Sequence, residues 1–131
     1  METHIRITGA LLMVLSVIHI GFPKRFNWKV ELQSLSLINK QIMQVHTFFI
    51  AFVVFLMGML CLVASTELVS THLGKMISLG LFIFWLFRLF FQLFVYSPQL
   101  WRGKTFETSV HLIFTALWCY LSAVFLLSFL Q

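Results

Sequence analysis

Four uninterrupted apolar runs dominate this sequence. They cover about residues 5–22, 43–65, 76–97 and 109–130. A hydrocarbon core of about 30 Å is crossed by roughly 20 helical residues, so each run is long enough to span a bilayer. Because 60% of the 131 residues are hydrophobic and only 10% are charged, little chain remains for a soluble domain. The sequence therefore predicts an all-α integral membrane protein, with residues 1–131 forming a single four-helix transmembrane domain.

The first run has one competing interpretation, a cleaved signal peptide, because a basic residue, Arg6, precedes its apolar stretch. The segment that follows reads HIGFPKR and contains no small-residue cleavage pattern of the A-x-A kind. We therefore expect a retained helix. A β-barrel is excluded by the pattern, because the apolar runs are continuous and do not alternate.

Basic residues outside the runs predict how the helices are oriented. Six of them lie in the connections after the first and third runs: Lys24, Arg25, Lys29, Lys40, Arg102 and Lys104. Only Arg6 and Lys75 lie on the opposite side. The positive-inside rule then places both basic connections in the cytoplasm and both termini on the non-cytoplasmic side, and short connections favour an up-down-up-down bundle. We expect the protein to lie in the bacterial inner (plasma) membrane. Its net charge of +5 is then explained by basic loops that determine topology and contact lipid headgroups, rather than by binding to nucleic acid.

Each run carries one polar side chain at a similar predicted depth. These residues are His19, His46, Gln92 and His111. At a rise of about 1.5 Å per residue, they lie roughly 6–9 Å inside the cytoplasmic boundaries. Polar stripes on membrane helices are expected to face the interior of the bundle, so the sequence predicts one polar layer there.

Three histidines in such a layer are candidate ligands for a metal or a haem. Neutral imidazole is the commonest protein metal ligand, so His19, His46 and His111 are the predicted ligands. Their outer partners would be Glu107, Gln92 and Asn39, which can orient a ligating ring. The alternative is that each histidine only hydrogen-bonds across helices and holds the bundle together. No HExxH, ExxH or CxxC spacing decides between the two interpretations.

Arg88 is the predicted anion-binding residue. It precedes Pro98 by about 15 Å of helix, a depth at which an unpaired charge costs at least about 2.5 kcal/mol. The chain has no Asp, and Glu107 is the carboxylate we consider first as a partner. The alternatives are a haem propionate, a lipid phosphate, a substrate carboxylate or an acidic residue of a partner subunit. The neighbouring rings of Trp85 and Phe91 are expected to add a cation–π contact.

Two functional hypotheses follow. The first is a redox or electron-transfer protein that holds haem b or a first-row transition metal, an arrangement shared with small haem-binding membrane proteins only at the level of architecture. The second is a non-catalytic accessory subunit or assembly factor without a cofactor. Its partners would be the lipid bilayer and either another membrane protein or a second copy of this chain. A transporter is disfavoured because the runs contain no acidic residue. The sequence does not decide whether the chain is an enzyme.

Overall fold

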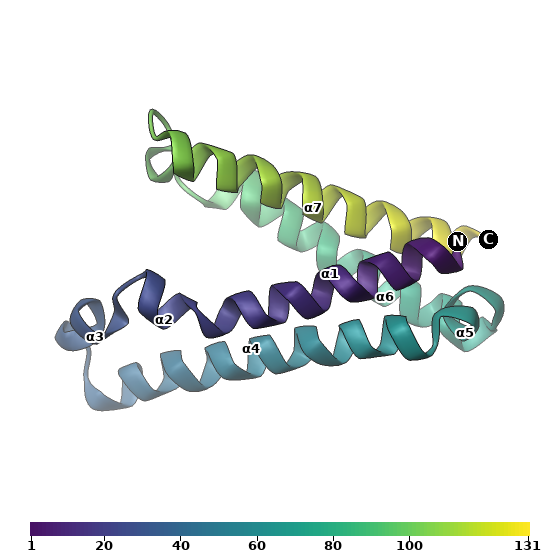
Figure 1. Ribbon diagram of the computed structural model, residues 1–131, viewed down its shortest axis with the longest axis horizontal. Coiled ribbons are helices and arrows are strands. Elements are labelled where there is room, and N and C mark those ends of the chain that lie inside the picture. Colours follow the sequence, from purple (N-terminus) through teal and green to yellow (C-terminus); the bar gives the residue numbers. More distant parts are fainter. The chain divides into compact units, whose positions relative to one another are not determined.

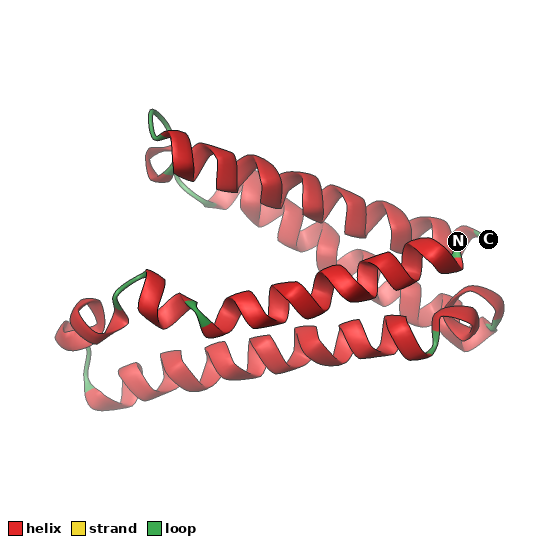
Figure 2. Ribbon diagram, viewed as in Figure 1, coloured by secondary structure: helices red, strands yellow, loops and turns green.

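The computed structural model describes all 131 residues and is entirely helical, with short connections (Figures 1 and 2). Its long helices are α1 (Glu2–Ile20), α4 (Leu37–Val63), α6 (His72–Phe90) and α7 (Thr105–Leu130). A π-helical segment, η2 (Phe91–Val95), extends α6 without a break. Four helices, with α6 and η2 counted together, are long and apolar enough to cross a membrane, which confirms the predicted fold class at that level.

Exposed apolar side chains cover much of these helices. Phe48 on α4, Phe87 on α6 and Phe94 in η2 are 62%, 61% and 73% exposed, and Ile113 on α7 is 65% exposed. Soluble monomers rarely leave so much contiguous apolar surface in contact with water. The distribution agrees with a protein whose outer surface meets lipid.

Short helical pieces occupy the connections between the long helices. They are α2 (Phe22–Arg25), α3 (Trp28–Glu31), η1 (Leu32–Ser34), α5 (Ser65–Ser70) and η3 (Pro98–Leu100). The segment between the second and third runs, which is short and polar in sequence, therefore contains a helix of its own, α5. Pro23 lies at the start of α2, where a missing backbone N–H costs nothing, and α1 has ended before it.

The helix ends agree with the predicted capping chemistry in one place and differ in another. The sequence offers Ser34 or Ser36 as the cap of a helix that begins before the second apolar run. Ser36 is the cap of α4, because its Oγ accepts a hydrogen bond from the backbone N–H of Asn39, and the helix begins at Leu37. For the last helix, the sequence offers Thr105 and Thr108 as capping candidates, and neither of them caps it. Thr105 is the first helical residue of α7, and Thr108 Oγ1 donates instead to the carbonyl of Trp101.

The chain divides into two compact units, residues 6–64 and residues 1–5 with 65–131. In the first unit, α1 and α4 approach closely at two glycines. A Cβ on Gly9 would lie 2.9 Å from the carbonyl oxygen of Gly58, and one on Gly58 would lie 3.0 Å from that of Gly9. Ser16 Oγ also donates to the carbonyl of Ala51 at 2.9 Å. Small residues thus permit close backbone contact, as is common between membrane helices.

In the second unit, α5, α6 and α7 meet around a buried carbonyl. The oxygen of Leu68 accepts hydrogen bonds from Ser78 Oγ at 3.4 Å and Ser128 Oγ at 3.3 Å, and the two hydroxyls lie 3.1 Å apart. Both serines are fully buried. The end of α5 is therefore tied to both long helices of its unit by polar contacts that are shielded from solvent.

Gly74 allows the sharp change of direction from α5 to α6. A Cβ at this position would collide with the carbonyl oxygen of Glu67 and would lie 2.6 Å from the Cα of Leu68. The obstacles are backbone atoms, which cannot rotate away. Gly80, in the same helix, has open space around it, because a Cβ added there would meet no heavy atom within 4 Å.

We predict that Gly74→Ala destabilises the protein by about 1–3 kcal/mol, the usual cost of forcing extra volume into a packed site. Gly80→Ala is the matched control and should be neutral or stabilising by up to about 1 kcal/mol, because alanine is the better helix former. Thermal unfolding of both variants in the same detergent measures the difference. Equal melting temperatures for the two variants would contradict the close approach at Gly74.

Candidate functional site

At the junction between α6 and η2, the backbone directs the side chain of Gln92 toward the interior of its unit. The backbone N–H of Tyr96 donates to the carbonyl of Phe91, five residues earlier, which is the π-helical bond. Such segments are rare and frequently occur at functional sites. Within it, Gln92 is 8% exposed although its neighbours Phe91 and Leu93 are both exposed. The local backbone thus presents one polar side chain to α7.

Gln92 bridges two side chains of α7. Its Nε2 lies 2.9 Å from His111 Nδ1, and its Oε1 accepts a hydrogen bond from Trp118 Nε1 at 3.4 Å. His111 and Trp118 are seven residues apart and therefore share one face of the helix. The amide thus pairs with two groups on one face of α7.

This bridge determines which nitrogen of His111 carries the proton. The indole N–H of Trp118 can only donate, so the oxygen of the Gln92 amide must face it. The amide NH₂ then faces His111 Nδ1, which must accept. In the neutral ring the proton therefore resides on Nε2, and His111 offers an N–H donor to its surroundings rather than a lone pair.

The indole of Trp101 packs against the face of the His111 ring. Trp101 stacks on the imidazole with ring centroids 4.5 Å apart and an interplanar angle of 13°. The Thr108 hydroxyl donates to the carbonyl of Trp101 and ties the connection to the first turn of α7. Trp101, whose place beside Arg102 and Lys104 is typical of a membrane-interface anchor, is thus also a structural partner of the histidine.

Arg88 lies over aromatic faces. Its guanidinium carbon is 5.0 Å from the ring centroid of Trp118 and 5.4 Å from that of Tyr96. Trp118 is itself stacked on Trp85, with centroids 5.1 Å apart and planes 14° apart. Cation–π contacts of this kind contribute about 0.5–2 kcal/mol. The rings that contact Arg88 are therefore Trp118 and Tyr96, not the predicted Trp85 and Phe91.

Glu107 is not among the partners that the structure gives to Arg88 and to His111 Nδ1. Aromatic rings occupy the neighbourhood of the guanidinium, and no ion pair joins it to a carboxylate. The partner of His111 Nδ1 is Gln92 rather than Glu107. Arg88, Gln92 and His111 form, with Trp118, the cluster that we treat as the candidate site.

The other predicted ligands lie in the first unit and have the opposite proton placement. His19 Nδ1 lies 2.8 Å from the carbonyl of Leu15, and His46 Nδ1 lies 2.9 Å from that of Ile42. A carbonyl only accepts, so each Nδ1 carries the proton and each neutral ring keeps a lone pair on Nε2. His19 is half-buried, whereas His46 and Asn39 are exposed.

No group of three or more His, Cys, Asp or Glu side chains that could hold a metal ion is present. The metal and haem assignments of His19, His46 and His111 stay predictions.

Comparison with protein-family models, with curated proteins and with solved structures gave no match. The functional argument therefore depends on the chemistry of these side chains alone.

We predict that the histidines differ in tautomer. At alkaline pH, where imidazoles are neutral, nitrogen NMR of histidine-labelled protein should show the proton on Nε2 in His111 and on Nδ1 in His19 and His46. Single His→Gln variants assign the signals. Gln92→Leu should release the His111 preference, whereas Gln99→Leu, at an exposed glutamine, should leave it unchanged. An Nδ1–H tautomer at His111 in the unaltered protein would contradict the bridge.

Proposed function

We propose that the protein is a non-catalytic integral membrane protein that binds the phosphate of an anionic phospholipid at Arg88. The four apolar helices would cross the bilayer in up-down-up-down order, with both termini on the non-cytoplasmic side. The distribution of basic residues supports this orientation, because six of the eight counted lie in the two connections placed in the cytoplasm.

The observation that carries the proposal is the state of the Arg88 guanidinium. Two rings contact it, and no carboxylate does. An aromatic ring attracts the positive charge, but it does not accept hydrogen bonds from the five N–H donors of the guanidinium as an anion does. A half-buried guanidinium in an apolar helix is stabilised most by a bidentate anionic oxygen group, and phosphate has the matching geometry.

The position of the charge favours a lipid headgroup over the other anions. The guanidinium reaches the ring of Tyr96, which follows the last residue of the span, so the charge lies nearer the membrane boundary than the Arg88 backbone does. Arg102 and Lys104 follow in the next connection. Basic residues and aromatic rings beside a cytoplasmic boundary are typical of sites that attract anionic lipids.

His111 fits the same role. Its neutral form offers Nε2–H as a donor, and Gln92 and Trp101 prevent the ring from turning freely. For His111 to ligate a metal through Nε2, the proton would have to move to Nδ1, against the amide NH₂ of Gln92. The bridge therefore favours anion recognition over metal ligation at this histidine.

One observation favours a second candidate, the haem or metal protein with a redox role. His19 and His46 each donate Nδ1–H to a backbone carbonyl, which is the arrangement that usually orients a metal-ligating histidine and leaves Nε2 available. A cofactor held in this way would supply the electron-transfer chemistry, and these two rings would supply nitrogen ligands to it.

For the lipid site, we predict that Arg88→Gln reduces retention of phosphatidylglycerol about tenfold in native mass spectrometry of the detergent-solubilised protein. A hydrogen bond to a charged group contributes about 1.5–3 kcal/mol, and tenfold corresponds to about 1.4 kcal/mol. Arg88→Lys should give an intermediate loss, because it keeps the charge without the planar fork. Lys75→Gln, at the other predicted membrane face, is the control and should have no effect.

Equal retention by the wild-type and Arg88→Gln proteins would overturn lipid binding at this site. If a stoichiometric membrane protein co-purified with the wild-type chain and was lost from Arg88→Leu, the anion would instead be a partner's carboxylate. The protein would then be an accessory subunit of a larger complex.

For the cofactor candidate, the expected result is a Soret band or a stoichiometric metal that disappears in His19→Ala and His46→Ala. His111→Ala should keep it, because the Gln92 bridge places the His111 proton on Nε2. A colourless, metal-free preparation of the unaltered protein contradicts this candidate and leaves the lipid site unaffected.

A further inference from the structure

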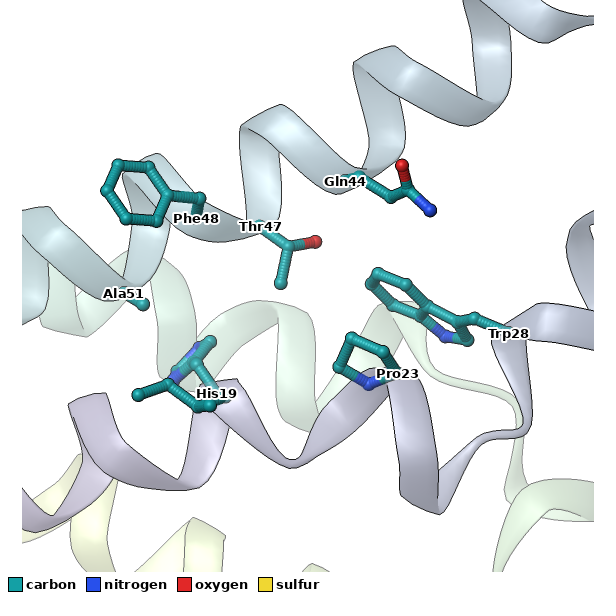
Figure 3. Close-up of a pocket in the computed structure, with 8 residues that line it drawn as sticks. His19, Pro23, Trp28, Gln44, Thr47, Phe48 and Ala51 are labelled. Atoms are coloured by element: carbon teal, nitrogen blue, oxygen red, sulfur yellow. The ribbon is translucent and has the colours of Figure 1, made fainter.

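A cavity of about 190 Å³ lies in the first unit, and none of its lining residues belongs to the Arg88 cluster. It is a partly open pocket lined by the end of α1, the short helices α2 and α3, and one face of α4. The residues that determine its chemistry are His19, Pro23, Trp28, Gln44, Thr47 and Phe48. Figure 3 shows Thr47 and Gln44 extending from α4 toward the side of the cavity formed by His19, Pro23 and Trp28.

The backbone beside the cavity has an unusual conformation. Asn27 has φ 54° and ψ 48° and is the only non-glycine residue with a positive φ. Asparagine tolerates the left-handed region better than most residues, but the conformation is uncommon. It reverses the chain between α2 and α3, immediately before Trp28. The indole is thereby brought to the cavity as one of its walls.

Two polar groups in the cavity wall can only accept a hydrogen bond from a ligand. His19 uses its Nδ1 proton for the carbonyl of Leu15, so its neutral ring has a lone pair on Nε2. Thr47 Oγ1 donates its proton to the carbonyl of Met43 at 2.8 Å, so its remaining lone pairs are acceptors. The donors in the wall are the amide of Gln44 and the indole N–H of Trp28.

The remaining wall is apolar and partly aromatic, and no lining residue is a carboxylate, lysine or arginine. A charged ligand would therefore lose its hydration without gaining an ion pair. Pro23, Trp28 and Phe48 offer flat surfaces to a ring. An apolar cavity of about 150 Å³ is already large enough to hold benzene, so about 190 Å³ accommodates one substituted ring.

We propose that this cavity binds a neutral, membrane-soluble phenol or quinol ring whose hydroxyl donates a hydrogen bond to His19 Nε2. The ring lies between the aromatic and proline walls, and Thr47 Oγ1 accepts from a second hydroxyl where the ligand has one. An apolar substituent of the ring extends out of the pocket beside Phe48 and Ile20, which are 62% and 74% exposed. The site recognises a donor, so it discriminates against a ring of the same shape that carries only acceptors.

The test compares 4-propylphenol with its methyl ether, 4-propylanisole, by saturation-transfer NMR titration of the full chain in detergent. The two probes have nearly the same shape, but only the phenol donates. We expect the phenol to bind at least about fivefold more tightly, because the ether leaves the acceptors of the cavity unpaired. Equal affinities would overturn the proposal without any mutation being made.

Two variants locate the interaction. His19→Phe keeps a ring and removes the acceptor, and it should abolish the preference for the phenol. His46→Phe is the matched control, because His46 makes the same bond to its own helix but does not line the cavity. Thr47→Val, which is close in shape, should reduce the affinity of a hydroquinone probe by about threefold and that of 4-propylphenol less.

Equal losses in His19→Phe and His46→Phe would show that the phenol partitions into the detergent or binds elsewhere, and would overturn the site. Should His19→Phe fail to fold, Thr47→Val and the comparison of phenol with ether still decide the question. Arg88→Gln should bind the phenol normally, so failure of the lipid site and failure of this cavity are distinguishable.

Discussion

The amide of Gln92 is the interaction on which the candidate site depends. One end of the amide only accepts and the other only donates, so its two α7 partners must face particular ends. Trp118, the obligate donor, takes the oxygen. His111 is left with the NH₂ group, and its own proton is directed to the far side of its ring. Leaving a hydrogen bond of a buried amide unmade is costly, so the orientation of the Gln92 amide is well determined.

The same bridge also supports the arginine. Trp118 is held by Gln92 at its indole nitrogen and stacked on Trp85, and its face then forms the platform for the Arg88 guanidinium. A charged group in an apolar helix needs some compensation for lost hydration. The rings supply part of it and leave the N–H edge of the guanidinium to an anion. This division of roles is the physical basis of the lipid-binding proposal.

Three histidines that look equivalent along the chain differ in chemistry because their Nδ1 atoms have different partners. His19 and His46 bond to carbonyls of their own helices one turn earlier, a local contact that leaves a lone pair on Nε2. His111 meets an amide from another helix, which leaves an N–H there. The former pair suits a metal or a hydroxyl ligand, and the latter suits an anion. Depth in the membrane, the only property that grouped them, does not determine this difference.

Features set by neighbouring residues were predictable, and several set by distant ones were not. The four long apolar helices and the Ser36 cap follow from residues within a few positions of each other, and the structure confirms them. The threonines at the start of α7 are suitable capping residues by sequence, but Thr108 donates instead to the carbonyl of Trp101 in the preceding connection. The seven-residue spacing puts His111 and Trp118 on one face of a helix, whereas the contact of Trp118 with Arg88 depends on the rotation of α6 against α7.

By itself, the sequence determined that this chain forms four helices suited to lipid, because apolar length and helical hydrogen bonding are properties of contiguous residues. It also identified Arg88, Gln92 and His111 as polar exceptions on helix faces. Only the tertiary structure decided that Gln92 bridges two side chains of α7, that rings rather than Glu107 meet Arg88, and that Trp28 folds over a cavity beside His19. These outcomes depend on distances of a few ångströms between residues far apart in the chain, which helix packing and the left-handed turn at Asn27 determine.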